Sequence, residues 1–322
     1  MKILITGCAG FIGYHVAEKI LNKFKSYQVF GVDNINSYYS KALKKKRVFD
    51  LKKNNKFKFL KMDISNKNYV DNFFKKHKFE IVIHMAAQAG VRYSFVNPES
   101  YIESNIKGFF NIIENSAKYK VKKFIFASSS SVYGEQKTYP FKENFELKPT
   151  NIYSFSKKLN EDFAKDLSTV TSMKIIGLRF FTIYGKFGRP DMFVFKFLRS
   201  SFKNLKFELN NNGNHNRDFT HIDDVTDIMN KLIKKKIKER YQIFNVCSNN
   251  PSSLPLLISK IKKILNIDTN VVKIRRNMAD VLMTHGDNGK IKKYLKIKKF
   301  RNIFNEIKDV IEWYKKNKIY KY

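Results

Sequence analysis

The sequence of 322 residues predicts an α/β fold with a doubly wound parallel sheet, followed by a smaller C-terminal α/β domain. Three observations predict it. Apolar strand-like runs alternate with helical patterns from the start of the chain. A glycine triplet follows the first run, and an acidic residue ends the second. Because ligands of open α/β sheets bind beyond the carboxyl ends of the strands, the same observations predict where a site should lie.

The alternation is regular up to about residue 180. Strands are expected at Lys2–Thr6, Gln28–Val32, Lys58–Met62, Ile81–His84, Phe124–Ser128 and Lys174–Leu178. Helices are expected at Phe11–Lys23, Ser40–Leu51, Tyr69–Lys75, Glu99–Lys118 and Tyr153–Leu167. Gly, Asn, Arg and Pro then become frequent, in residues 185–190 and 210–216. We therefore expect one domain from residues 1–180, completed by part of 217–249, and a second from 181–322 that packs on it to form a cleft.

Composition argues against a disordered chain, a disulfide-linked secreted protein and a membrane-spanning protein. Hydrophobic residues make up 43% of the chain, enough for a substantial core. Two distant cysteines, Cys8 and Cys247, favour a reducing, cytoplasmic location. No signal peptide is visible and no apolar run approaches the roughly 18 residues of a membrane span, so no membrane insertion is expected.

The chain is strongly basic, with a formal net charge of +35 from 63 Lys and Arg against 28 Asp and Glu. Such a charge is typical of proteins that bind nucleic acid or anionic membrane surfaces. The lysines are scattered, however, and the cluster at residues 234–238 lacks the interleaved aromatic residues of a single-strand binding platform. A solvated, lysine-rich surface is the favoured interpretation, and no nucleic-acid partner is expected.

The glycine triplet has the spacing G-x-x-G-x-x-G within residues 6–13 and opens the first helix. Gly7 permits a tight turn, Gly10 lets the backbone approach a pyrophosphate at the helix N-terminus, and Gly13 allows close packing of helix on strand. Phe11 and Ile12 complete this turn. These five residues are the first candidates for contact with a dinucleotide.

Asp33 ends the second strand twenty residues after the last glycine of the triplet, and Asn34 follows it. A carboxylate there should bind the adenosine ribose hydroxyls and repel a 2′-phosphate, which favours NAD over NADP. Further candidate contacts with NAD follow the third and fourth strands or lie in the helix after them: Asp63, Ile64, Ala86, Ala87, Gln88 and Asn105. Two of these have alternatives, since Asp63 could instead cap the next helix and Asn105 could be a plain surface residue. No metal site is expected.

Four serines, residues 128–131, follow the fifth strand, and Tyr153 and Lys157 stand one helical turn apart further on. Residues at i and i+4 share a helix face. A Lys ammonium beside a phenol lowers the phenol pKa from about 10, so the tyrosine could act as a base near neutral pH. Ser129, Tyr153 and Lys157 therefore predict a proton-transfer set beside the nicotinamide.

Together these motifs resemble the extended short-chain dehydrogenase/reductase family, whose Rossmann fold binds NAD, over nearly the whole chain. Several stretches are similar to UDP-glucuronate 4-epimerases of polysaccharide synthesis, including capsule and lipopolysaccharide: Gly31–Tyr39, Ala86–Ser94, Arg179–Gly185, Gly188–Met192 and Arg217–Thr220. The resemblance implies that Ser129, Tyr153 and Lys157 are catalytic, that residues 181–322 mainly bind the UDP-sugar and that the protein is a homodimer. The helices near Glu99–Lys118 and Tyr153–Leu167 would pair with their copies.

The resemblance also implies a substrate-binding set. Thr182, Arg189 and the serines Ser130 and Ser131 would hold the sugar carboxylate, Arg217 would neutralise the diphosphate, and Arg92 would lie near the sugar; a loop salt bridge is the alternative for Arg189 and for Arg217. Arg276 and Asp280 would contact UDP, although the segment around them departs from the family pattern. Lys186 also departs from it, since it stands where the family has proline.

The function expected is NAD-dependent C4 epimerisation of UDP-glucuronate to UDP-galacturonate, through a transient 4-keto sugar that turns before it is reduced again. Related dehydratases carry acids at the positions of Ser130 and Ser131, so their absence disfavours elimination of water. Alternatives are a 4-epimerase of UDP-glucose or of a UDP-N-acetylhexosamine, a UDP-glucuronate decarboxylase, and a non-catalytic relative that binds NAD or RNA.

Overall fold

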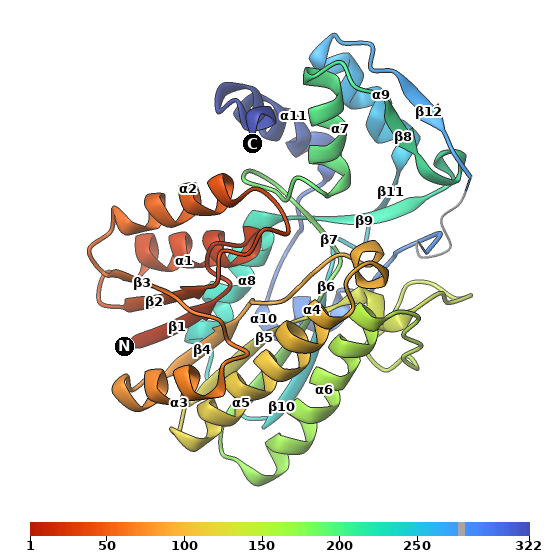
Figure 1. The fold of residues 1–322 in the computed structure, drawn as a ribbon. Coiled ribbons are helices and arrows are strands. Elements are labelled where there is room, and N and C mark those ends of the chain that lie inside the picture. The colour runs from red at the N-terminus through yellow and green to blue at the C-terminus, as the bar shows by residue number, and fades with distance from the viewer. Residues whose placement is uncertain (276–280) are drawn as a thin grey trace.

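The computed structural model describes residues 1–275 and 281–322, and within them the first six strands and a later one form a seven-stranded sheet (Figure 1). The strand order is β10-β6-β5-β4-β1-β2-β3, and every neighbouring pair is parallel. The strands are β1 (Lys2–Thr6), β2 (Gln28–Asp33), β3 (Phe57–Lys61), β4 (Ile81–His84), β5 (Lys123–Ser129), β6 (Lys174–Phe180) and β10 (Tyr241–Val246). The predicted doubly wound parallel sheet is confirmed.

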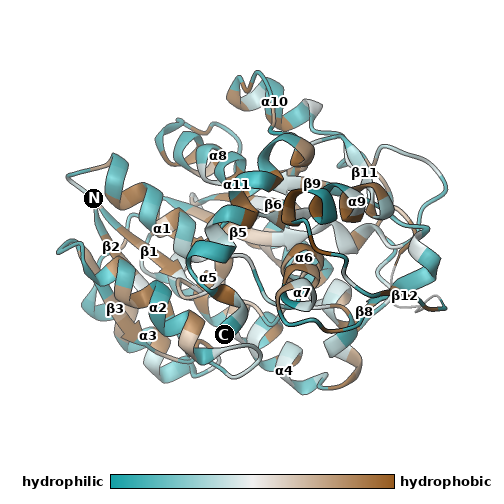
Figure 2. Cartoon of the chain, turned by 90° about the horizontal axis from the view of Figure 1, so that it is seen from above, coloured by the Kyte–Doolittle hydropathy of each residue, from teal (hydrophilic) through white to brown (hydrophobic). Residues whose placement is uncertain are grey.

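Successive side chains of each strand point to opposite faces of the sheet, so both faces are apolar. Helices cover both of them. Ile3 and Ile5 of β1 belong to one buried cluster, whereas Leu4 belongs to another. The first cluster includes residues of α1 (Phe11–Lys23), α2 (Lys41–Lys52) and α8 (Ile222–Lys234), and the second those of α3 (Lys67–Lys76), α5 (Gly108–Lys118) and α6 (Ile152–Val170). Hydrophilic residues gather along the outer parts of the helices, as Figure 2 shows.

One predicted helix differs in its course. The sequence pattern indicates a continuous helix at Glu99–Lys118, but the structure has the short α4 (Glu99–Tyr101), a π-helical turn at Ile102–Lys107 and then α5. The π turn contains the buried Asn105, whose side chain hydrogen-bonds outside its own helix. Such π turns occur often at functional sites.

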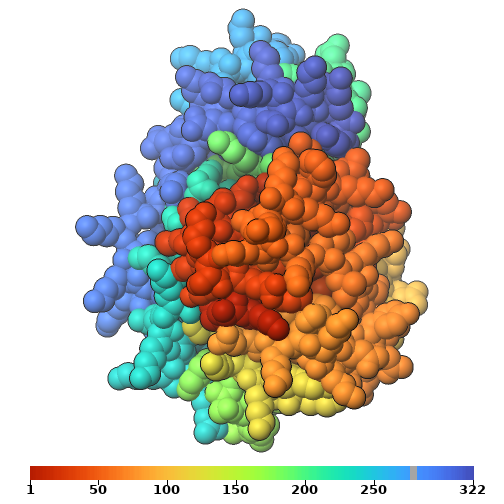
Figure 3. All heavy atoms as spheres, turned by 90° about the vertical axis from the view of Figure 1, so that its left-hand side faces the viewer, coloured from red at the N-terminus to blue at the C-terminus, as the bar shows by residue number. Residues whose placement is uncertain are grey.

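Shorter elements beyond β6 form the second part of the molecule. These are β7 (Thr182–Tyr184), β9 (Asn216–His221) and β11 (Pro251–Ser253) in one sheet, β8 (Phe207–Leu209) paired with β12 (Val271–Lys273), and the helices α7 (Phe193–Phe202), α9 (Leu254–Leu265) and α11 (Ile303–Lys316). Helix α10 (Gly289–Leu295) packs instead on β10 and α8. Between β9 and β11 the chain returns to the first sheet through α8 and β10. In Figure 3 the C-terminal residues, in dark blue, lie directly above the N-terminal ones, in red and orange.

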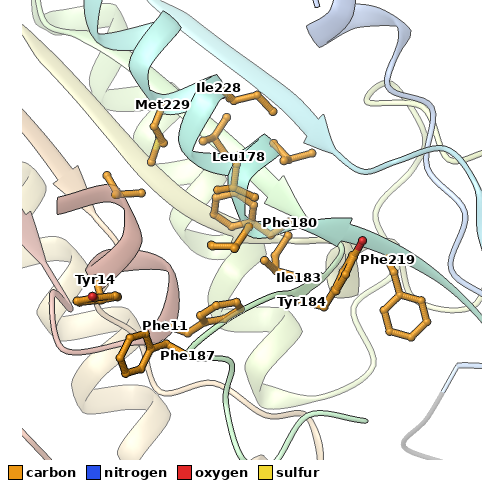
Figure 4. Close-up of a cluster of buried hydrophobic side chains, with 14 of the residues drawn as sticks. Phe11, Tyr14, Leu178, Phe180, Ile183, Tyr184, Phe187, Phe219, Ile228 and Met229 are labelled. Carbon is orange, nitrogen blue, oxygen red and sulfur yellow. The ribbon is translucent and has the colours of Figure 1, made fainter. Parts of the chain in front are cut away.

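A continuous hydrophobic cluster joins the two parts (Figure 4). Tyr14 of α1 packs edge-on against Phe187, with ring centroids 4.9 Å apart. Phe180, Ile183 and Phe219 continue the cluster between the ends of β6, β7 and β9. The segment after β7 is therefore held against the first helix.

None of the helices in the described part of the chain combines the length and apolar character needed to cross a membrane.

Candidate functional site

A cavity of about 830 Å³ lies at the carboxyl ends of the parallel strands and extends to the second part of the molecule. It is lined by most of the residues that the sequence singles out: Gly7, Gly10, Phe11, Ile12, Gly13, Asp33, Asn34, Ile64, Ala86, Ala87, Gln88, Arg92, Ser129, Ser130, Ser131, Tyr153, Lys157, Thr182, Arg189 and Arg217. Asp63 and Asn105 lie just behind this lining. Residues from distant segments thus share one site.

The turn between β1 and α1 leaves no room for side chains. Gly7 has φ +69°, and a Cβ there would come within 2.6 Å of the Ala86 backbone nitrogen. A Cβ on Gly13 would meet the Gly7 carbonyl oxygen at 2.2 Å. Helix α1 begins after Gly10 without a side-chain cap and without an acid in its first turn. Its first N–H groups are therefore available to an anion such as a pyrophosphate, and the turn fits a dinucleotide.

Asp33 lines the cavity beside this turn. Its carboxylate accepts hydrogen bonds from the backbone N–H groups of Ala9, at 3.1 Å, and Ile35, at 2.8 Å. Burial raises the pKa of Asp33, while these two hydrogen bonds and the nearby charge of Lys44 lower it. The carboxylate is thus fixed against the glycine turn, where it suits recognition of ribose hydroxyls.

Asp63 is tied to the loop after β3. It accepts hydrogen bonds from the backbone and the hydroxyl of Ser65, and from the Asn34 side chain at 3.2 Å. The alternative that it caps the following helix is wrong, because the cap of α3 is Asn66, whose side chain accepts from the Tyr69 N–H. Asp63 thus fixes Asn34, which lines the cavity.

Asn105 connects two segments behind the cavity. Its side chain accepts from the Gln88 N–H at 2.7 Å and donates to the Gln88 carbonyl and to the Ser156 hydroxyl, both at 3.0 Å. The residue is buried, so the alternative of a plain surface residue is wrong. Asn105 holds the backbone after β4 against α6, the helix that carries Tyr153 and Lys157.

The hydroxyl-rich end of β5 faces Tyr153. Burial raises the pKa of Tyr153, and the hydrogen-bonding hydroxyl of Ser129 together with the positive charge of Arg189 lowers it. The sequence pattern predicts a phenol whose pKa is lowered by Lys157, and the structure differs because burial outweighs the other influences. Ser129 also accepts from the Ser131 N–H at 3.2 Å, which fixes the serine turn.

Lys157 is buried beneath the same end of β5. Its ammonium donates to the Ala127 carbonyl at 2.8 Å. Burial lowers the pKa of Lys157 to about 8, and the negative charge of Glu161 opposes this by raising it. A positive charge is therefore available on this side of the cavity at neutral pH.

A buried ionic network lies behind these residues. Glu161, one turn after Lys157 on α6, forms two hydrogen bonds with Arg179 of β6, at 2.9 and 2.7 Å. It also accepts from the Ser128 hydroxyl. Arg179 donates further to the Tyr133 hydroxyl at 2.8 Å. The network thus joins α6, β5 and β6 directly behind the serine turn.

The other side of the cavity carries Arg189. Its guanidinium forms an ion pair with Asp191, through Nε at 3.0 Å and Nη2 at 2.5 Å, so the salt bridge left as an alternative is present. The Tyr38 hydroxyl donates to the same carboxylate at 2.9 Å. Thr182 begins β7 in this wall, and Arg92 lies exposed in a 3-10 turn at the rim.

Arg217 lies in β9 in the second part of the molecule. Its guanidinium donates to the backbone carbonyls of Asn216, Val281 and Leu282, at 2.7 to 3.0 Å. It thereby holds the segment from residue 281 onward beside the cavity. Arg276 and Asp280 lie outside the described residues.

Several lining residues carry polar groups that sequence reasoning missed: Asn36, Tyr38, Lys44, Asp191, Lys196, Asn210, His215 and Thr284. Tyr38 and Asp191 stand inside the stretches that carry the family resemblance, and that was their only signal. Lys44 stands in a run of three lysines and is indistinguishable in sequence from a surface residue. In the structure its ammonium is buried and donates to the Asn36 side chain at 2.7 Å.

Comparison with known proteins gives a consistent result. Residues 3–247 match the model of the NAD dependent epimerase/dehydratase family. A UDP-glucuronate 4-epimerase from Thermodesulfobacterium geofontis is 35% identical over 316 residues, which are 98% of this chain and 96% of that relative.

Two solved structures share the fold over almost their entire length. A UDP-glucuronic acid 4-epimerase from Bacillus cereus, in complex with UDP-glucuronic acid and NAD, has a TM-score of 0.92 at 27% identity, covering 98% of this chain and 100% of that one. A UDP-glucose 4-epimerase from Thermotoga maritima with UDP-glucose has a TM-score of 0.88 at 28% identity, covering 98% and 99%.

Proposed function

The chain belongs to the NAD-dependent epimerase/dehydratase family and is an NAD-dependent isomerase, a 4-epimerase of a UDP-sugar, and we propose that it interconverts UDP-glucuronate and UDP-galacturonate. One observation carries this proposal. Serine and threonine hydroxyls and Arg189 surround the cavity beside Tyr153, and the serine turn brings no acid to it.

The N-terminal turn and the strand ends would hold NAD. The side-chain-free turn at Gly7 and Gly10 would take the pyrophosphate, and Asp33 would take the adenosine ribose. Lys157 would take the nicotinamide ribose. When bound, NAD supplies the redox chemistry by accepting hydride from C4 of the sugar and returning it to the opposite face.

The chain itself handles the proton. Tyr153 would accept the proton of the C4 hydroxyl and later return one to the C4 oxygen, while Ser129 hydrogen-bonds that oxygen. The raised pKa of Tyr153 makes it a strong base once ionised, and the hydroxyl of Ser129 and the positive charge of Arg189 favour ionisation. The turn of the keto sugar between the two steps inverts C4 with no net redox change.

A 4-keto uronate is a β-keto acid and loses CO₂ when the breaking C–C bond aligns with the carbonyl π system. An epimerase must therefore hold the carboxylate away from that orientation. Ser130, Ser131 and Thr182 would do this with neutral hydrogen bonds, and Arg189 with a charged one. Arg217 and residues of the second part would anchor the diphosphate, and Arg92 would lie near the sugar.

The experiment that tests the proposal follows products by NMR after purified protein is incubated with UDP-glucuronate and NAD. UDP-galacturonate should accumulate to an equilibrium mixture. A dominant UDP-pentose with release of CO₂, or no turnover, would contradict it. UDP-glucose is the second candidate, favoured by the Thermotoga maritima structure. Parallel kcat/KM values for both sugars decide between them.

We also propose that the protein is a homodimer built through α5 and α6. Both helices expose large apolar side chains: Phe110, 40% exposed, on α5, and Phe155 and Leu159, 57% and 47% exposed, on α6. Pairing of these helices with their copies would bury them. Sedimentation should show a dimer, and Phe155→Lys should yield a monomer.

A further inference from the structure

Arg47 of α2 is the largest side chain among those that the structure fully buries, with 0% exposure. Its guanidinium donates to the Ala9 carbonyl at 2.8 Å, the Tyr39 hydroxyl at 2.7 Å and the Phe187 carbonyl at 2.6 Å. A longer bond of 3.4 Å reaches the Gly188 carbonyl. All these acceptors are neutral. The Asp33 carboxylate is near enough for the Arg47 charge to lower its pKa, but it forms its hydrogen bonds with Ala9 and Ile35. A buried cation without a hydrogen-bonded anion keeps a large desolvation cost, so its retention needs a reason beyond packing.

The acceptors belong to two different walls of the cavity. Ala9 lies in the glycine turn, and its N–H donates to the Asp33 carboxylate at 3.1 Å. Phe187 and Gly188 directly precede Arg189 on the opposite wall. The guanidinium therefore joins, through a single rigid group, the turn that contacts NAD and the segment that carries Arg189. Arginine suits this task because its planar fork fixes several acceptors in one geometry.

A second link runs parallel to the first. Tyr39 accepts from Arg47, and its neighbour Tyr38 donates to Asp191, the ion-pair partner of Arg189. The segment after β2 thus contacts both the helix that carries Arg47 and the loop after β7. A movement of the glycine turn would therefore change the position of Arg189 through two sets of hydrogen bonds, those to Phe187 and Gly188 and those of Tyr38 and Tyr39.

We propose that Arg47 is a positioning residue that couples the two ligands, so that bound NAD strengthens the binding of UDP-glucuronate and the sugar nucleotide strengthens the binding of NAD. NAD fixes the glycine turn, and Arg47 transmits that order to the loop that presents Arg189. Coupling between two ligands is reciprocal. This inference rests on the proposed function, because it takes Arg189 to bind the carboxylate.

The test measures coupling by calorimetry. The Kd of NAD is determined with and without saturating UDP-glucuronate in the Tyr153→Phe background, where no turnover interferes. In the Tyr153→Phe protein that keeps Arg47, the Kd of NAD should be at least about fivefold lower with the sugar nucleotide than without it. Arg47→Met should bring this ratio close to one. UDP, which lacks the carboxylate, should give a ratio that depends little on Arg47.

Lys45→Met is the matched control, since Lys45 is exposed on the same helix, and it should leave the ratio unchanged. Arg47→Lys covers the case in which Arg47→Met does not fold, because a single ammonium cannot reach both walls and should give a smaller ratio. An unchanged ratio in a folded Arg47 variant, or a ratio of one in the parent, would overturn the inference. Turnover by the unsubstituted protein is measured in parallel, and its absence would refute the proposed function instead.

Discussion

Two buried arginines stand behind opposite walls of the cavity, and they are stabilised in different ways. Arg179 is neutralised by Glu161 through two hydrogen bonds and contacts the Tyr133 hydroxyl. Arg47 donates to backbone carbonyls and a phenol, none of which carries charge. One wall is therefore backed by a directly hydrogen-bonded ion pair. The other is backed by a cation whose hydrogen bonds go to neutral groups and whose charge also acts on the nearby Asp33 carboxylate.

The difference separates two tasks. The wall backed by Arg179 carries Ser129, Tyr153 and Lys157 on regular elements, and these are the groups that we propose exchange protons. The wall backed by Arg47 carries Arg189 in the loop after β7, with Thr182 at the start of that strand. Loss of a group from the first wall should lower kcat, and loss of a group from the second should raise KM. Four changes test this division, from the largest expected effect to the smallest.

Tyr153→Phe removes the proton acceptor from the first wall. We expect kcat to fall by about 10²–10⁴-fold, the range for loss of a general acid–base group. KM for UDP-glucuronate and the affinity for NAD should change little, because the ring remains in place. Steady-state kinetics and NAD titration measure the two effects. Retained turnover would show that Tyr153 is not the group that accepts the C4 hydroxyl proton.

Glu161→Gln breaks the compensated pair and leaves Arg179 buried without its anion. The free energy of unfolding should fall by about 3–5 kcal/mol, because an unpaired buried charge is costly. Urea denaturation at a fixed NAD concentration measures it. Asp162→Asn is the control, since Asp162 is the next residue on α6 and forms an exposed pair with Lys158. Equal free energies of unfolding for Glu161→Gln and Asp162→Asn would show that the buried ion pair does not stabilise this wall.

The two walls also differ in how far the sequence predicts them. The first follows from local patterns: alternation places the serines at a strand end, and a four-residue spacing places Tyr153 and Lys157 on one helix face. Arg47 gives no such signal, because it stands in a polar, lysine-rich helix. Its burial depends on Phe187, 140 residues away. The π turn at Asn105 likewise has no signal in the local sequence, and the partners of its side chain lie in other segments.

Arg189→Met tests the second wall. KM for UDP-glucuronate should rise about 10- to 100-fold, because a charged hydrogen bond is worth about 1.5–3 kcal/mol. Inhibition by UDP, which has no carboxylate, should stay close to that of the parent. This ligand serves as the control within one variant. An equal loss of affinity for UDP and UDP-glucuronate would show that Arg189 acts on the diphosphate or on the fold instead.

The smallest effect concerns pH. Burial lowers the pKa of Lys157 to about 8, so its ammonium is present below pH 8 and is lost above it. If the charge favours ionisation of Tyr153, kcat should fall by about tenfold from pH 8 to 9.5. Because Glu161 raises the pKa of Lys157, Glu161→Gln should move this decline to lower pH, and Asp162→Asn should not. A kcat that rises steadily to pH 9.5 would mean that neutral Lys157 suffices and that the first wall works through Ser129 and Tyr153 alone.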